Sequence, residues 1–309
     1  MTRFFHGALA MSFCSISLFG CSPTKVAGPP KPAKPVAKPT ATPKPTPTPL
    51  PGTPWQHKPL PAWAKAQPFG HVPLRPGQKL IALTFDDGPW PQYTREILDV
   101  LHDHDVPATF FVLGSNVKNY PKLTRAIRDE GHVIGTHSWS HPSRPRDPRG
   151  EIERTNKIIE RTVGFSPLLF RPPYGILRNG LAREAKRHGQ AVVIWSIDSH
   201  DWRHGTSDSI YQTLMRQASR GGIALMHDGG GNRRSTARAL PRVIESLRAR
   251  GYRFVTVPEL LQARYVAPKV KKKAPVKTRG QAKHQSTPQR RAPSAATSHT
   301  STNRPTVIS

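Results

Sequence analysis

Between residues 79 and 264, short apolar runs alternate with longer stretches in which apolar residues recur every three or four positions. The short runs predict buried strands, and the longer stretches have the periodicity of amphipathic helices. The expected strands are residues 81–85, 109–113, 133–136, 168–171, 192–197, 223–226 and 253–256. The expected helices are residues 94–104, 122–130, 151–163, 181–188, 209–219 and 236–250. This alternation is typical of parallel β/α units, and seven units predict an α/β barrel rather than a small open sheet.

The sequence on either side of this alternation has no periodic apolar face. Residues 1–21 combine an early basic residue, an apolar core and small residues near the end, which predicts an export signal. Its end resembles a bacterial lipobox in which Cys21 is lipidated, with an uncleaved anchor or plain secretion as alternatives. Residues 22–66 are rich in Pro and Lys and predict an extended polyproline II spacer. Residues 267–309 contain no acidic residue, which predicts a disordered basic tail, so the folded domain is assigned to residues 67–266.

Charge and cysteine content narrow the possible chemistry. The chain has 47 Lys and Arg against 19 Asp and Glu, a formal net charge of +28, and much of this excess lies in the spacer and the tail. Such a balance suits anionic cell-wall polymers, membrane surfaces or nucleic acid, and the export signal argues against nucleic acid. Both cysteines, Cys14 and Cys21, lie in the leader. The folded part therefore has no thiolate site, and any metal must be held by His, Asp or Glu.

Two adjacent carboxylates follow the first expected strand. Asp86 and Asp87 lead directly into a Gly-Pro turn. Because neighbouring residues at the end of a strand point to opposite sides, one carboxylate can reach a metal while the other faces a substrate. A capped turn is the alternative, since Asp, Gly and Pro are common at strand ends.

Two histidines, His137 and His141, follow the third expected strand. Residues four apart share one face of a helix, so both imidazoles can bind one ion; a polar turn is the alternative. With an aspartate from a neighbouring strand they would form a three-ligand site with open positions, as a catalytic metal requires. A metal in such a site lowers the pKa of bound water and polarises a carbonyl group.

Ionisable residues also follow the fourth, fifth and sixth expected strands. Arg171 could pair with a carboxylate, and the backbone N–H of Tyr174, in a loop stiffened by two prolines, could face an oxyanion. Asp201 and His227 could form a pair that supplies a general acid or base, whereas Asp228 is expected to point elsewhere. Taken singly, each could be a simple turn or surface residue. Because all of them follow strand ends, which form one face of a barrel, we expect a single active site.

Five motifs resemble, in the same order, those of the polysaccharide deacetylases of carbohydrate esterase family 4, the NodB-homology domain. They are TFDDGP at 84–89, HSWSHP at 137–142, RPPYG at 171–175, DSHDW at 198–202 and LMH at 225–227. The resemblance spans residues 79–261. It implies a distorted barrel of seven or eight β/α units and metal-dependent hydrolysis of N-acetyl groups from acetylamino sugars.

The resemblance also implies a role for each motif residue. One divalent metal ion, zinc or alternatively cobalt or another ion, would be bound by Asp87, His137 and His141. Asp86 would be the catalytic base held by Arg171, and His227 would be the general acid tuned by Asp201. The Tyr174 N–H would polarise the acetamide carbonyl, and Trp202 and Leu225 would line the pocket for the acetyl methyl group.

Peptidoglycan is the expected acetylated glycan substrate, because export, a lipid anchor, a spacer and a cationic tail suit an enzyme directed at the cell wall. Chitin-like oligomers and O-acetylated xylan are alternatives, as is a non-catalytic protein that binds wall glycans. We expect an exported monomer anchored as a lipoprotein facing the wall or periplasm. Its tail would contact an anionic wall polymer or the membrane surface, and no specific nucleic acid partner is expected.

Overall fold

The computed structural model describes residues 59–203, 205–264 and 266. The predicted export signal with Cys21, most of the predicted spacer and the basic tail lie outside these residues. The described chain begins just before α1 (Ala62–Ala66), where Leu60 and Ala64 are buried. Packing of the described domain therefore begins upstream of residue 67. No helix of the described part is long and apolar enough to cross a bilayer.

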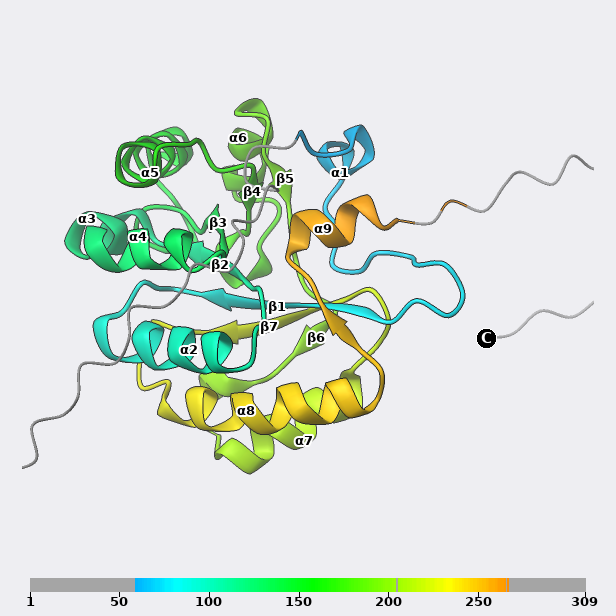
Figure 1. The fold of residues 1–309 in the computed structure, drawn as a ribbon. Coiled ribbons are helices and arrows are strands. Elements are labelled where there is room, and N and C mark those ends of the chain that lie inside the picture. The colour runs from blue at the N-terminus through cyan, green and yellow to red at the C-terminus, as the bar shows by residue number, and fades with distance from the viewer. Residues whose placement is uncertain (1–58, 204, 265, 267–309) are drawn as a thin grey trace, which may run out of the picture. The chain divides into compact units, whose positions relative to one another are not determined.

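The strands form one sheet of eight parallel strands that curls on itself (Figure 1). Its centre is β1 (Leu80–Asp86), which pairs with β2 (Thr109–Val112), with β7 (Gly222–His227) and, at its start, with β8 (Arg253–Phe254). The outer strands are β3 (Val133–Thr136), β4 (Leu169–Phe170), β5 (Ala191–Val192) and β6 (Ile197–Asp198), in the sheet order β5-β4-β3-β2-β1-β7-β6. This curled sheet with helices outside it confirms the predicted α/β, barrel-like fold class.

The single strand predicted at residues 192–197 is wrong. The structure divides it into β5 and β6, which lie at opposite ends of the sheet order. Only four residues join them, so the two edges of the sheet must lie close together. Phe69 lies in the gap: its N–H donates to Val192 O (3.2 Å) and its carbonyl accepts from Ile194 N (2.8 Å). The run is apolar except for Ser196, and a single serine does not mark the change of strand partner.

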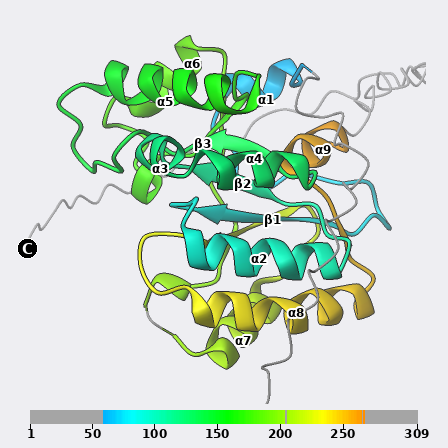
Figure 2. The same cartoon turned by 60° about the vertical axis from the view of Figure 1, so that its left-hand side comes forward.

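The six predicted helices are present, and three short ones were not predicted. The predicted helices are α2 (Pro91–Asp103), α4 (Pro121–Asp129), α5 (Pro148–Val163), α6 (Leu181–Arg187), α7 (Ser207–Gln217) and α8 (Arg234–Ala249). The others are α1, α3 (Gly114–Asn119) and α9 (Val257–Gln262), each shorter than two turns. Helices α2, α8 and α7 cover one side of the sheet, as Figure 2 shows. A capping box between Thr256 and Glu259 marks the start of α9. This pattern of residues could have predicted the helix from the sequence.

Alternate residues of β1 face two different cores. Ile81, Leu83 and Phe85 pack in the core beneath the outer helices, whereas Leu80 and Ala82 pack in a second core inside the curled sheet. The next two inward positions are polar: Arg171 Nη1 donates to Thr84 Oγ1 (2.7 Å) and to Asp86 Oδ1 (2.8 Å). The same two-residue period that buries the start of β1 therefore places Asp86 inside the open end of the barrel.

The two ends of the described domain lie together at the amino-terminal end of the strands. Gln262 Nε2 donates to Pro59 O (3.4 Å). Leu60 and Ala64 share the inner core with Leu260 and Leu261 and with the first residues of several strands. Figure 1 shows α1 and α9 on the side of the sheet opposite to the strand arrowheads. The segments that flank the domain therefore join it behind the barrel.

A buried histidine makes folding stability depend on pH. Burial lowers the pKa of His132 to about 3, so the ring stays neutral in the folded state. The unfolded chain takes up a proton below its ordinary pKa of about 6.5, so this stability contribution is present above pH ~6.5 and is lost as the pH falls. We expect the stability difference between wild type and His132→Asn to shrink by up to about 1.4 kcal/mol per pH unit. Urea unfolding of both proteins at pH 4 to 7 checks this, and a pH-independent difference would contradict it.

Candidate active site

The turn after β1 holds Asp87 in a left-handed backbone conformation, with φ of 73°. Asn116 on α3 donates from Nδ2 to Asp87 O (2.8 Å), and Asp228 Oδ1 accepts from Gly88 N (3.1 Å). On the other side, a side chain at Gly229 would overlap the Asp87 carbonyl oxygen, so only glycine lets the loop after β7 pack this closely. Contacts from β2–α3 and β7–α8 therefore fix the position of Asp87.

Asp87, His137 and His141 form a three-ligand cluster whose donor atoms all lie within 4.8 Å of one another. Asp87 Oδ1 is 3.4 Å from His141 Nε2 and 3.6 Å from His137 Nε2. That oxygen is buried and has no hydrogen-bond partner within the described chain. A buried carboxylate oxygen without a partner is costly unless a cation satisfies it, so the cluster fits a metal ion such as zinc, which takes His and Asp ligands.

The two histidines meet through a turn and not through a helix. Ser138 and His141 both have positive φ, 70° and 60°, and His141 N donates to Ser138 Oγ (3.0 Å). The shared helical face expected from the four-residue spacing is therefore wrong, although the two rings do lie side by side, with centroids 4.9 Å apart. Spacing alone could not distinguish the two geometries.

Surrounding groups set the state of His137. Its Nδ1 lies 2.7 Å from the backbone carbonyl oxygen of Arg171. That oxygen can only accept a hydrogen bond, so Nδ1 carries the proton. The unprotonated Nε2 lies on the side of Asp87, where both residues can bind one cation. Burial lowers the pKa of His137 to about 3. The ring is therefore neutral and oriented for metal binding, as is usual for His ligands whose second nitrogen is hydrogen-bonded.

Asp86 and Arg171 form a buried ion pair beside this cluster. Arg171 is fully buried, and its guanidinium lies 4.1 Å from the ring centre of Phe111. Burial raises the pKa of Asp86, and the charge of Arg171 opposes that rise. The carboxylate is thus more basic than an exposed aspartate, and its second oxygen lies 3.7 Å from His137 Nε2.

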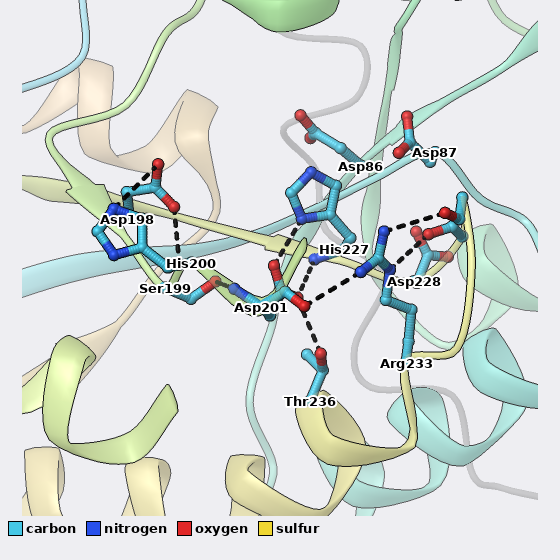
Figure 3. A network of polar contacts seen from close by, with 12 residues as sticks. Asp86, Asp87, Asp198, Ser199, His200, Asp201, His227, Asp228, Arg233 and Thr236 are labelled. Carbon is cyan, nitrogen blue, oxygen red and sulfur yellow. Dashed lines mark hydrogen bonds and ion pairs between the residues drawn. The ribbon is translucent and has the colours of Figure 1, made fainter. Parts of the chain in front are cut away.

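His227 and Asp201 form a second buried pair across the pocket (Figure 3). His227 Nδ1 donates to Asp201 Oδ1 (2.7 Å), and Asp201 Oδ2 accepts from His227 N (2.8 Å). Burial alone would lower the pKa of His227, but Asp201, with smaller contributions from Asp86 and Asp87, raises it to about 9. Conversely, burial would raise the pKa of Asp201, but the charge and hydrogen bond of His227, with Arg233 and Thr236, together lower it. The ring is therefore protonated at neutral pH.

Two residues that the sequence interpretation did not assign to the site support it. Thr236 Oγ1 donates to Asp201 Oδ2 (2.8 Å), and Arg233 donates to the backbone oxygens of Asp201 (3.2 Å) and Gly229 (2.7 Å). Arg233 thus ties the loop that packs on Asp87 to the residue that orients His227 (Figure 3). Asp228 points away from the pocket, as expected, and accepts from Thr94 Oγ1 (2.6 Å). No sequence motif marked Arg233 or Thr236, because their role depends on the fold.

These groups open into a pocket of about 350 Å³. Tyr174 and Trp202 form its exposed sides, at 62% and 44% exposure, and Leu225 contributes a buried apolar wall. Arg171 and Asp201 lie behind the lining residues that they orient. The remaining lining residues are Asp86, Asp87, His137, His141, Pro172, Trp195, Asp198, His227 and Arg233. All predicted site residues except Cys21, which lies outside the described residues, are therefore brought together.

A second group of potential metal ligands lies on α5 and α6. Glu153, Glu184 and His188 offer donor atoms within 4.8 Å of one another. However, Arg149 contacts Glu153 (2.6 Å) and Arg187 contacts Glu184 (2.9 Å). Because arginines already neutralise both carboxylates, this cluster is an ion-pair network and not a metal centre.

Known proteins resemble both the sequence and the fold. Residues 74–193 match the family described as polysaccharide deacetylase. A peptidoglycan-N-acetylglucosamine deacetylase of Bacillus cereus is 39% identical over 207 residues, 64% of this chain and 97% of that protein. A chitooligosaccharide deacetylase of Bradyrhizobium is 35% identical over 217 residues, 65% of this chain and 98% of that protein. The crystal structure of the Bc1960 peptidoglycan N-acetylglucosamine deacetylase is 38% identical with a TM-score of 0.59, covering 63% of this chain and 92% of that one.

A curled parallel sheet with an Asp-His-His cluster, a basic aspartate and a protonated histidine at one rim defines a metal-dependent hydrolase. The chain belongs to the polysaccharide deacetylase family, whose members hydrolyse acetyl groups from polysaccharides.

Proposed function

We propose that this protein removes acetyl groups from N-acetylglucosamine units of peptidoglycan, using one zinc ion. The observation that carries the proposal is the convergence of three groups on one pocket: the metal-ligand cluster, the Asp86–Arg171 pair and the His227–Asp201 pair. The named relatives support peptidoglycan first and chitin-like oligomers second. Zinc suits a site of two imidazoles and one carboxylate with open positions.

Each residue of the pocket has a distinct task in amide hydrolysis. Held by Asp87, His137 and His141, the metal would polarise the acetyl carbonyl and acidify the attacking water. Asp86, made basic by burial and held by Arg171, accepts a proton from that water. The Tyr174 N–H donates to the developing oxyanion.

His227 protonates the leaving amine, and apolar side chains hold the acetyl methyl group. Protonated at neutral pH, His227 donates its Nε2 proton to the amine nitrogen as the C–N bond breaks. Asp201 orients the ring through Nδ1 and stabilises its charge. Trp202 and Leu225 enclose the acetyl methyl group, and the products are acetate and a glucosamine unit.

Export and anchoring remain part of the proposal. A leader lipidated at Cys21, a Pro/Lys-rich spacer and a basic tail that contacts anionic wall polymer or the membrane surface would hold a monomeric enzyme at the wall. Fractionation of cells that produce wild type or Cys21→Ser tests the anchor: the variant should leave the membrane fraction.

Acetate release tests the catalytic proposal. Full-length protein loaded with zinc should release acetate from purified peptidoglycan, and removal of the metal with a chelator should lower the rate at least about 100-fold. Restoring zinc should restore the rate, and cobalt should be compared with it. Release from a chitin oligomer alone would keep the mechanism but replace the substrate. Release from neither glycan by folded, metal-loaded protein would favour a non-catalytic wall-binding protein or an ester substrate such as acetylxylan.

A further inference from the structure

Large apolar side chains are exposed mainly in loops at the carboxyl-terminal rim of the sheet. Of the five among the described residues, Trp90 follows β1, Tyr174 and Leu177 follow β4, and Trp202 follows β6; only Val266 lies elsewhere. Tyr174 and Trp202 line the catalytic pocket, whereas Trp90 does not, although it is 40% exposed. Exposed aromatic groups at a rim often mark a binding surface, so Trp90 needs its own explanation.

Trp90 stands at one end of a groove between α2 and α4. Its ring lies edge-on to that of Tyr120, with centroids 6.3 Å apart. The groove extends from Tyr120 over about 590 Å³, with Pro91 and Pro121 on its sides and Leu123 in its lining. Its lining is mainly apolar, and Asn119 and Lys122 supply polar groups. Arg95 also borders it, but its guanidinium is bound by Glu130 (2.6 and 2.8 Å).

The groove is linked to the catalytic site by the chain segment that holds Asp87. Three peptide units separate Trp90 from Asp87, so their Cα atoms lie at most about 11 Å apart. On the other wall, Asn116 donates to Asp87 O, and its helix ends at Tyr120. Trp90 N donates to Thr94 Oγ1 (2.7 Å), which in turn donates to Asp228. The groove and the metal-ligand cluster are therefore held by the same contacts.

We propose that Trp90, Tyr120 and this groove bind the sugars next to the acetylated unit that occupies the catalytic pocket. The inference rests on the proposed deacetylase function and adds to it a preference for long glycan strands. A sugar ring has flat apolar faces that pack on aromatic and proline rings, and hydroxyl groups that suit the Asn119 amide and the Lys122 ammonium. Flat side chains with a few polar groups on one wall match that chemistry.

Substrate length is the variable that tests the groove. We would compare kcat/KM for acetate release from the pentamer and the dimer of N-acetylglucosamine in zinc-loaded full-length protein. Trp90→Ala and Tyr120→Ala should each lower the pentamer-to-dimer ratio up to about tenfold, the fold-change expected for loss of one aromatic contact. Trp90→Phe, which keeps a ring, should retain most of the ratio. Tyr252→Ala, an aromatic truncation next to β8, is the matched control.

A binding measurement separates failure of the groove from failure of the proposed function. In Asp86→Asn protein, the pentamer should bind about tenfold more weakly when Trp90→Ala is added. If wild type releases no acetate from any glycan, the proposed function fails, and this titration still decides whether the groove binds sugars. Equal pentamer affinity with and without Trp90 would overturn the inference. So would an equal loss of activity on dimer and pentamer, which would show that Trp90 only supports the Asp87 turn.

Discussion

Asp86→Asn should lower kcat for acetate release by about 10³-fold, within the range that general-base catalysis contributes. The amide cannot accept a proton from water at neutral pH. However, its oxygen can still accept the hydrogen bond from Arg171 Nη1 that Asp86 Oδ1 accepts at 2.8 Å. The buried arginine therefore keeps a partner, and the fold should be retained. The measurement is steady-state acetate release from peptidoglycan with zinc in excess.

Two controls make this result specific. Asp208→Asn removes an exposed carboxylate on α7 that pairs with Arg242 and does not line the pocket, and it should leave kcat within twofold. Zinc affinity of Asp86→Asn should stay close to wild type, because Asp87 and the two histidines supply the ligands. If Asp86→Asn kept wild-type kcat, another group would have to be the base and the proposed mechanism would be wrong.

Arg171→Met should damage both stability and activity. It leaves Asp86 as a buried carboxylate without its cation, and breaking a buried pair in this way costs about 3–5 kcal/mol. Burial raises the pKa of Asp86 and Arg171 opposes that rise, so loss of the arginine should raise this pKa further. Less of the base is then ionised at pH 7. We therefore expect the acidic limb of the pH–rate profile to move to higher pH and kcat at pH 7 to fall at least about 100-fold.

The pH profile distinguishes an electrostatic role from simple loss of structure. Arg171→Lys keeps a positive charge, but its single ammonium cannot reproduce the planar guanidinium, whose Nη1 donates to Thr84 and Asp86 while Nη2 donates to Ile194 O (3.4 Å). The acidic limb of the pH–rate profile of Arg171→Lys should lie between those of wild type and Arg171→Met. Urea unfolding with the same three proteins gives the stability change. If Arg171→Met lost activity without any shift of the acidic limb of its pH–rate profile, the electrostatic role assigned to Arg171 would be wrong.

How far the sequence predicts the molecule depends on how local each interaction is. The strand-end pattern located Asp86, Asp87, His137 and His227, because a two-residue period and a following turn are written in adjacent residues. The break between β5 and β6 could not be predicted, because Ser196 is the only polar residue in 192–197 while the neighbouring strand changes from β4 to β7. Likewise, Arg233 and Thr236 reach Asp201 from more than 30 positions away, and only the assembled sheet brings them together.

The placement of both ends of the described domain behind the barrel gives this domain a front and a back. Pro59 and Gln262 meet beside the core that plugs the amino-terminal end of the strands, while the catalytic pocket opens at the other end. A segment that continues from either end of this domain can therefore leave it without crossing the entrance. A tether attached at residue 59 pulls on the rear of the domain, so tension in it would leave the entrance facing outward. A domain attached in this way would present its pocket to a substrate too large to diffuse to it.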